Sequence, residues 1–287
     1  MEKRSEKRAQ KDKKKNSAVQ LILTAIFAAI FIYGAVNLFD IWQEYRESES
    51  LYQNAQEEFL QPVEPIEEEN KLVDARLDFA VDFDSLQAVN PDVAGWIWMK
   101  DTVVNYPVLH SQKNNDEYLY TTYDGKNNSS GSIFIDYRNN SGYVDDNTVL
   151  YGHNMKNGSM FAVLRKMTGQ EFYDTHKEFY ILTPEGNRRY EIISVFEVDA
   201  LSSLYDRQFA AEEDKQDWLD RVVKKSAILS PFSADITDTF VTLSTCVSGD
   251  DLRARIVAVG RLAEIEELYL PEAEPVETND AVQQKVK

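Results

Sequence analysis

The residue best suited to covalent chemistry in this chain is its single cysteine, Cys246. It closes a predicted strand, TFVTLSTC, and precedes a polar segment, VSGDDL, and functional groups often lie where a strand ends on such a loop. A thiol with an unperturbed pKa of about 8.5 needs a proton partner for acyl transfer near neutral pH, and imidazole is the usual one. A lone cysteine is more often a small buried hydrophobic residue. Whether Cys246 is a nucleophile therefore depends on the residues that could act with it.

The chain has three histidines, and one of them ends a strand in the same way as the cysteine. His153 closes the apolar run NTVLYGH and precedes the loop NMKNG, which makes it the preferred general acid and base. His110 also follows a predicted strand and is the alternative. His176 lies in the charged stretch YDTHKEF and is predicted to be a surface residue.

Two arginines shortly after the cysteine could supply a charge clamp. Arg253 and Arg255 alternate in RARIVAVG, so both lie on one face of a predicted strand. A guanidinium stays charged and offers a fork of donors, so it can stabilise a developing oxyanion or hold a substrate carbonyl. The pattern does not show which of the two arginines is the clamp. Either one could instead be a solvated residue on the surface of the strand.

Short β-like runs separated by turn signals must position these residues. They occupy residues 94–99, 103–110, 131–137, 147–153, 179–184, 188–200, 237–246 and 253–262. Helical patterns are predicted near 83–89, at 160–167 and at 210–229. This spacing favours a mostly β fold, a sandwich or a barrel, over a βαβ sheet.

The N-terminus has the pattern of a membrane anchor. Residues 1–15 carry eight Lys/Arg against three Asp/Glu, and no charged residue occurs from Ala18 to Phe39. These 22 positions exceed the ~20 that a spanning helix needs, whereas the apolar part of a cleaved signal peptide, the alternative, is ~7–15 residues. The positive-inside rule places residues 1–17 in the cytoplasm, 18–39 in the membrane and the remainder outside.

The remaining segments flank one compact region. Residues 40–75 are rich in Glu and Gln and are predicted to be a solvated spacer, helical at first and broken by Pro62 and Pro65. A dimerising helix through Ile41, Tyr45, Leu51 and Tyr52 is the alternative. Residues 76–265 form the predicted catalytic domain, and the acidic residues 266–287 are predicted to be a disordered tail.

Composition excludes several classes of function. The formal net charge of −18 disfavours nucleic-acid binding, which needs dense Lys and Arg. One cysteine excludes an intrachain disulfide framework and a Cys-rich zinc site. An idle free thiol outside the cell is an oxidation hazard, which favours a functional Cys246.

The assembled pattern resembles the sortases, the cysteine transpeptidases of the Gram-positive cell surface. The family signature TLxTC reads here Thr242-Leu243-Ser244-Thr245-Cys246, and the family histidine and arginine match His153 and Arg255, with Arg253 as the register alternative. The resemblance implies a closed eight-stranded sortase-type β-barrel with an N-terminal helix. The serine of TLSTC, the run GSIFIDYRN and the helical insert at 210–229 look like class B rather than the pilin-assembling class C.

The resemblance also implies a reaction. Cys246 attacks a C-terminal sorting motif of a secreted protein, typically Asn-Pro-x-Thr-x for class B, and a peptidoglycan amine resolves the thioester. Arg255 steadies the oxyanion and His153 moves the proton, without a metal or an organic cofactor. Ser244, Asn115 and Leu119 are implied substrate contacts. Some class B members assemble pili, so a sortase that polymerises pilins is an alternative to one that anchors proteins to the wall.

Two further alternatives come from other classes of protein. Papain-like wall hydrolases place the cysteine before the histidine in the chain, whereas here His153 precedes Cys246. A non-enzymatic anchored binding protein would use Cys246 only as a core residue. The oligomeric state is left open by the sequence.

Overall fold

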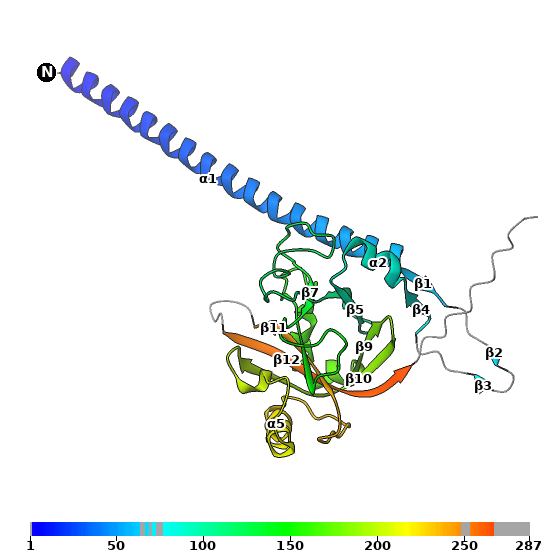
Figure 1. Cartoon of the computed structure of the whole chain (residues 1–287). Coiled ribbons are helices and arrows are strands. Elements are labelled where there is room, and N and C mark those ends of the chain that lie inside the picture. Colours follow the sequence, from blue (N-terminus) through cyan, green and yellow to red (C-terminus); the bar gives the residue numbers. More distant parts are fainter. Residues whose placement is uncertain (1, 64–66, 69–70, 73–76, 248–252, 267–287) are drawn as a thin grey trace, which may run out of the picture.

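Eight strands close into a barrel in the computed structural model, which describes residues 2–63, 67–68, 71–72, 77–247 and 253–266 (Figure 1). The order around the barrel is β10-β12-β11-β8-β7-β6-β5-β9, and β6/β7 and β8/β11 are the parallel pairs. The strands are β5 (Val93–Trp98), β6 (Asn105–Leu109), β7 (Ile133–Ile135), β8 (Asn147–Tyr151), β9 (Glu178–Thr183), β10 (Gly186–Asp199), β11 (Phe240–Cys246) and β12 (Ala254–Glu266). The predicted closed eight-stranded barrel is therefore confirmed.

The barrel strands are built from β-branched and aromatic residues, which suit a pleated surface with neighbours on both sides. Ile133, Phe134 and Ile135 of β7 are all buried, because the barrel interior takes one face and covering segments take the other. Gly260 of β12 lets the ring of Phe179 in β9 lie close to the backbone. A Cβ at this position would lie 2.6 Å from the ring of Phe179, so the absence of a side chain lets the two strands pack.

One continuous helix, α1 (Glu2–Phe59), begins far from the barrel and ends against it (Figure 1). From Gln20 onward it is long and apolar enough to cross a membrane, judged by length and composition, and its most apolar 18 residues have a mean hydropathy of 2.2. After Phe59 the chain enters the short strand β1 (Leu60–Pro62), which pairs with β4 (Phe79–Val81). A second short pair is β2 (Glu67–Glu68) with β3 (Lys71–Leu72).

The last part of α1 is not solvated on all sides. Ser48, Tyr52, Ala55 and Phe59 are buried against the barrel. Their spacing of three and four residues forms one stripe along the helix. The sequence suggested a solvated spacer or a dimerising face here, and the structure instead covers this stripe with the chain's own barrel.

A second helix, α5 (Glu212–Lys225), packs on the outside of the barrel, away from α1 (Figure 1). Trp218, Leu219 and Val222 form its buried face and join a cluster with residues of β10, β11 and β12. Its first turn is acidic and its last turn basic, which complements the helix dipole. This is the helical insert expected at 210–229.

Shorter helices complete the fold. They are α2 (Phe83–Val89), η1 (Phe161–Val163), α3 (Leu164–Met167), α4 (Gln170–Thr175) and η2 (Ser203–Tyr205). Asp82 caps α2 by accepting a hydrogen bond from the backbone N–H of Ser85 at 3.0 Å. The predicted domain boundaries stay predictions, and Pro65 and the tail residues 267–287 lie outside the described residues.

Replacing Trp218 with Ala should lower the free energy of unfolding by about 3 to 5 kcal/mol, because the fully buried indole leaves a cavity between α5 and the barrel. Val223→Ala is the matched control on the exposed side of the same helix and should change stability by less than about 0.5 kcal/mol. Urea titration of the detergent-solubilised chain measures both. Equal effects of the two variants would contradict the packing described for α5.

Candidate active site

The parallel pairing of β8 with β11 brings the cysteine and the histidine together. Ser244 of β11 is the register partner of Tyr151 of β8, and Cys246 and His153 each follow two residues later. Parallel strands end at the same edge of a sheet, so both side chains reach the same rim of the barrel. The backbone N–H of Gly152 continues the ladder by donating to the carbonyl of Ser244 at 3.1 Å.

Side-chain hydrogen bonds tie the two strand ends together beyond the ladder. Thr245 Oγ1 donates to the carbonyl of Gly152 at 2.7 Å. Asn154 Nδ2 donates to the carbonyl of Cys246 at 2.8 Å and to that of Val247 at 3.1 Å. The residue after the histidine therefore holds the backbone of the cysteine, and these two bonds fix the spacing of the pair.

Arg255 and Arg253 occupy different surroundings. Arg255 is the register partner of Cys246 across the antiparallel pair β11/β12, and its Nη1 donates to the carbonyl of Ala254 at 3.1 Å. Arg253 precedes β12, and its exposed side chain pairs with Asp199 at 2.8 Å. Of the two, Arg255 is the one beside the cysteine.

His153 is held by a backbone carbonyl. Its Nε2 lies 2.7 Å from the carbonyl oxygen of Leu119. A carbonyl oxygen can only accept, so the neutral imidazole carries its proton on Nε2 and leaves Nδ1 as the nitrogen that can exchange a proton. Burial lowers the pKa of His153, and the hydrogen bond to Leu119 opposes part of that shift.

Cys246, His153 and Arg255 line one cavity of about 260 Å³. Cys246 is exposed, so its thiol is accessible. A thiol, an imidazole and a guanidinium around one cavity can act as nucleophile, proton carrier and oxyanion clamp, which are the parts that acyl transfer needs. The roles of the three residues stay predictions.

The three residues predicted to contact substrate also line this cavity: Ser244, Asn115 and Leu119. Ser244 is almost fully buried and shares a 2.8 Å hydrogen bond with the hydroxyl of Tyr205. Asn115 donates to Asp136 at 3.1 Å and accepts from the N–H of Tyr137 at 2.9 Å. The side chains of Ser244 and Asn115 therefore already form hydrogen bonds within the protein. The carbonyl of Leu119 forms the hydrogen bond with His153.

Sequence reasoning did not find Tyr205, although it lines the cavity. Burial raises its pKa to about 12, so it stays a neutral hydroxyl at physiological pH. It lies in η2, within an irregular stretch whose pattern gives no signal of function. Asn154 was missed too, and its place directly after His153 was the available clue.

Asp136 was the third residue missed, and it lies behind the cavity wall as a buried charge. Arg138 grips it with two hydrogen bonds of 2.8 Å, and the hydroxyl of Tyr151 donates to it at 3.1 Å. Burial alone would raise the pKa of Asp136, but the hydrogen bonds from Arg138 and Asn115 outweigh it and lower the pKa to about 2. The ionised carboxylate thus fixes Asn115 and Tyr151, which line the cavity.

The other two histidines lie elsewhere. His110 follows β6 and lines a different cavity with Asp92 and Pro184. His176 stacks on Phe172 with ring centroids 4.0 Å apart. Asp250 and Asp251 of the segment after the cysteine lie outside the described residues.

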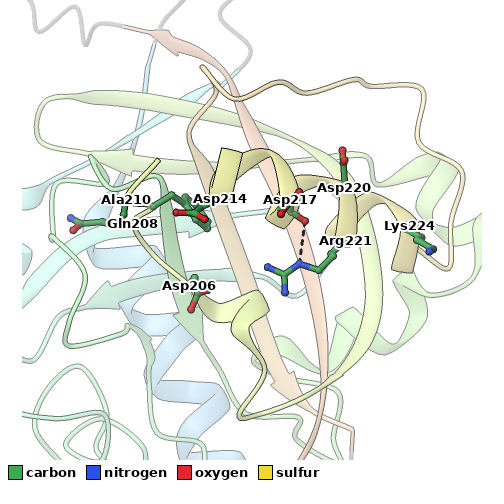
Figure 2. Close-up of a pocket in the computed structure, with 9 residues that line it drawn as sticks. Asp206, Gln208, Ala210, Asp214, Asp217, Asp220, Arg221 and Lys224 are labelled. Atoms are coloured by element: carbon green, nitrogen blue, oxygen red, sulfur yellow. Dashed lines mark hydrogen bonds between the residues drawn. The ribbon is translucent and has the colours of Figure 1, made fainter. Parts of the chain in front are cut away.

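A larger cavity, of about 640 Å³, lies beside α5 (Figure 2). Charged side chains dominate it: Asp206, Asp214, Asp217, Asp220, Arg221 and Lys224. Arg221 Nε donates to the carbonyl of Asp217 at 3.1 Å. None of the predicted site residues lines this cavity, so size does not identify the site and the placement of the reactive groups does.

Known proteins share both the sequence and the fold of this barrel. A family model described as a sortase domain matches residues 97–263. Sortase B of Listeria monocytogenes is 39% identical over 178 residues, which are 62% of this chain and 72% of that protein.

Two solved structures extend the comparison. Sortase B from Bacillus anthracis in complex with AAEK1 superposes with a TM-score of 0.66 at 32% identity, covering 78% of this chain and 99% of that one. A Staphylococcus aureus sortase B–substrate complex gives a TM-score of 0.60 at 33% identity, covering 63% and 84%. With the family model matched across its barrel and a relative 39% identical, this chain belongs to the sortase family and is most like its class B members.

Proposed function

We propose that this sortase-type cysteine transpeptidase is anchored in the cell membrane by α1 and transfers secreted proteins to the cell wall. Its substrate is a C-terminal sorting motif of the Asn-Pro-x-Thr-x type, and its acceptor is an amine of peptidoglycan. The class of enzyme follows from the sortase domain. The S. aureus sortase B–substrate complex supports substrate binding by this fold.

In the first half-reaction, the thiolate of Cys246 attacks the carbonyl carbon of the motif threonine. A C–S bond forms, the carbonyl oxygen takes up the negative charge, and Arg255 donates hydrogen bonds to it. The tetrahedral species then breaks its C–N bond, and protonated His153 gives its proton to the leaving amine. The product is a thioester between Cys246 and the substrate.

In the second half-reaction, the acceptor amine attacks the thioester carbonyl. His153, now neutral, takes the proton from the attacking nitrogen, and the C–S bond breaks to return the thiolate of Cys246. A new amide joins the secreted protein to the acceptor. Water in place of the amine gives hydrolysis, the side reaction.

The observation that carries this proposal is the shared cavity. Cys246, His153 and Arg255 come from three different strands or strand ends and line the same space of about 260 Å³. The hydrogen bonds of Asn154 to the carbonyls of Cys246 and Val247 support a fixed geometry for the nucleophile. Preorganised groups of this kind act without rearrangement during the reaction.

The chemistry of α1 supports the anchor and its direction. Lys13, Lys14 and Lys15 precede the apolar stretch, so the positive-inside rule puts the N-terminus in the cytoplasm and the barrel outside the cell. Trp42 follows that stretch, and the guanidinium of Arg46 lies 5.3 Å from its ring. An aromatic ring with a cation suits the membrane–water interface.

The function is tested by incubating the full-length protein in detergent with a peptide containing Asn-Pro-x-Thr-x and a triglycine acceptor. Mass spectrometry should detect the Cys246 thioester and the ligated peptide. Iodoacetamide should label Cys246 in the folded protein and stop the reaction. If the thiol is unreactive and the peptide binds without being cut, the chain is a binding protein instead.

Cys246→Ala should abolish peptide cleavage, and His153→Ala should lower kcat/KM by about 10²- to 10⁴-fold, because the nucleophile and the proton carrier are lost. Circular dichroism should show unchanged folding. His176→Ala is the matched control, since this imidazole stacks on Phe172 away from the cavity, and it should keep full activity. Wild-type turnover in either cavity variant rejects the assignment.

Arg255→Lys should reduce kcat/KM by about 10²-fold, because an ammonium keeps the charge but lacks the planar donor fork. Arg253→Lys is the matched control, two residues away and paired with Asp199 outside the cavity, and should remain within about twofold of wild type. Peptide-cleavage kinetics compare the two. Greater damage from the Arg253 variant would transfer the role to that residue.

A further inference from the structure

The segment 118–132 forms an irregular hairpin between α1 and the cavity. Three backbone hydrogen bonds pair its two arms: Thr122 N to Lys126 O at 2.9 Å, Asn128 N to Tyr120 O at 2.9 Å, and Ser132 N to Tyr118 O at 3.0 Å. We call it the 118–132 hairpin. Its first arm includes Leu119, the partner of His153, and its second arm runs along α1.

Three residues of α1, spaced four apart, hold the second arm of the hairpin. The carboxylate of Glu44 accepts from the N–H of Ser129 at 2.8 Å, Ser48 Oγ donates to Ser130 Oγ at 2.6 Å, and the hydroxyl of Tyr52 donates to the carbonyl of Gly131. Residues four apart lie on one face of a helix, so these three can each form a hydrogen bond with one of three successive residues of the arm. Tyr52 is buried and also packs its ring on Tyr106 and Tyr123.

The two arms come into close contact at Gly131. This residue has φ +53°, and a Cβ built on it would lie 2.7 Å from the carbonyl oxygen of Tyr118 and closer still to that of Leu119. Only glycine tolerates both the backbone conformation and this approach. The carbonyl of Leu119 is therefore in direct contact with the residue whose own carbonyl is held by Tyr52.

We propose that Tyr52 of the membrane-proximal helix is a positioning residue for His153, acting through Gly131 and the Leu119 carbonyl to keep the imidazole proton on Nε2. The importance of this role for catalysis rests on the proposed function of His153. Tyr52 does not line the cavity, and its hydroxyl contacts Gly131 and Ser132 of the hairpin, so we expect the hydroxyl to act on His153 through the hairpin.

The surroundings of His153 support this dependence on one carbonyl. Arg255, Cys246 and Asp116 line the same cavity, and the ring of Tyr120 lies 5.5 Å from the imidazole with an interplanar angle of 36°. Within the part of the chain that the structure describes, the hydrogen bond from Nε2 to Leu119 selects the tautomer. If the carbonyl is displaced, the proton of the neutral imidazole can move to Nδ1. Nδ1 can then no longer accept the proton of the attacking amine in the second half-reaction.

The test reads the tautomer directly. The chain has three histidines, so ¹⁵N-histidine labelling of the full-length protein in detergent gives three imidazoles, with His176 as an internal reference. In the wild type, neutral His153 should show the pattern of the Nε2–H tautomer. Tyr52→Phe, which keeps the ring and removes the hydroxyl, should shift the ¹⁵N signals toward a mixture and lower kcat by at least about 10-fold.

Gln56→Met is the matched control on the same helix. Gln56 Nε2 donates to the carbonyl of Asn105 at 2.9 Å, so this variant also deletes one hydrogen bond from α1 to the barrel but leaves the 118–132 hairpin untouched. It should keep the wild-type ¹⁵N pattern and kcat. A Gln56 variant that perturbs His153 as much as Tyr52→Phe would reduce Tyr52 to a general docking residue.

Gly131→Ala is a second variant that pushes directly on the Leu119 carbonyl, and it should disturb His153 more than Tyr52→Phe does. If it fails to fold, the Tyr52 variant decides alone. Unchanged ¹⁵N signals of His153 in a folded Tyr52→Phe protein overturn the positioning role. Absence of peptide cleavage by the wild type would instead reject the proposed function, because the tautomer is measured without substrate.

Discussion

The register between β8 and β11 is the constraint on which the candidate active site depends. Ser244 opposes Tyr151 in this parallel pair, so the residues that follow each strand meet at one rim. A slip of one residue would turn Cys246 to the other face of the sheet and separate it from the cavity. The register is well determined because six of the seven residues of β11 are buried, with β12 on one side and β8 on the other.

Behind this rim, a buried charge connects residues of the cavity wall through hydrogen bonds. Asp136 is satisfied by Arg138, Asn115 and Tyr151, so its carboxylate is stable inside the protein. Its pKa, lowered to about 2, lies below that of an unfolded aspartate near 3.9. The sign of the linkage follows: the carboxylate stabilises the fold above about pH 4, and this contribution is lost as the pH falls toward 2.

The helix α1 has two chemically different parts. Large apolar side chains such as Leu21, Phe27 and Phe31 are exposed along its first part, where a bilayer would remove them from water. The second part, from Ser48 to Phe59, buries a stripe against the barrel. Because the helix is continuous, the element that emerges from the proposed anchor is the same element that contacts the 118–132 hairpin. One continuous helix therefore joins the proposed anchor to the hairpin that carries the His153 partner Leu119.

Local patterns in the sequence determined the reactive residue types, the strand ends that carry Cys246 and His153, and the β-rich class of the fold, since alternation and turn residues act over a few positions. They could not choose between Arg253 and Arg255, which lie on one face of the same run. The fold separated them, because β12 begins after Arg253 and sets Arg255 opposite Cys246. The cover over Tyr52 and the contribution of Tyr205 also came only from tertiary structure. Both depend on contacts between segments far apart in the chain, and such contacts are set by strand register and packing, which no local pattern encodes.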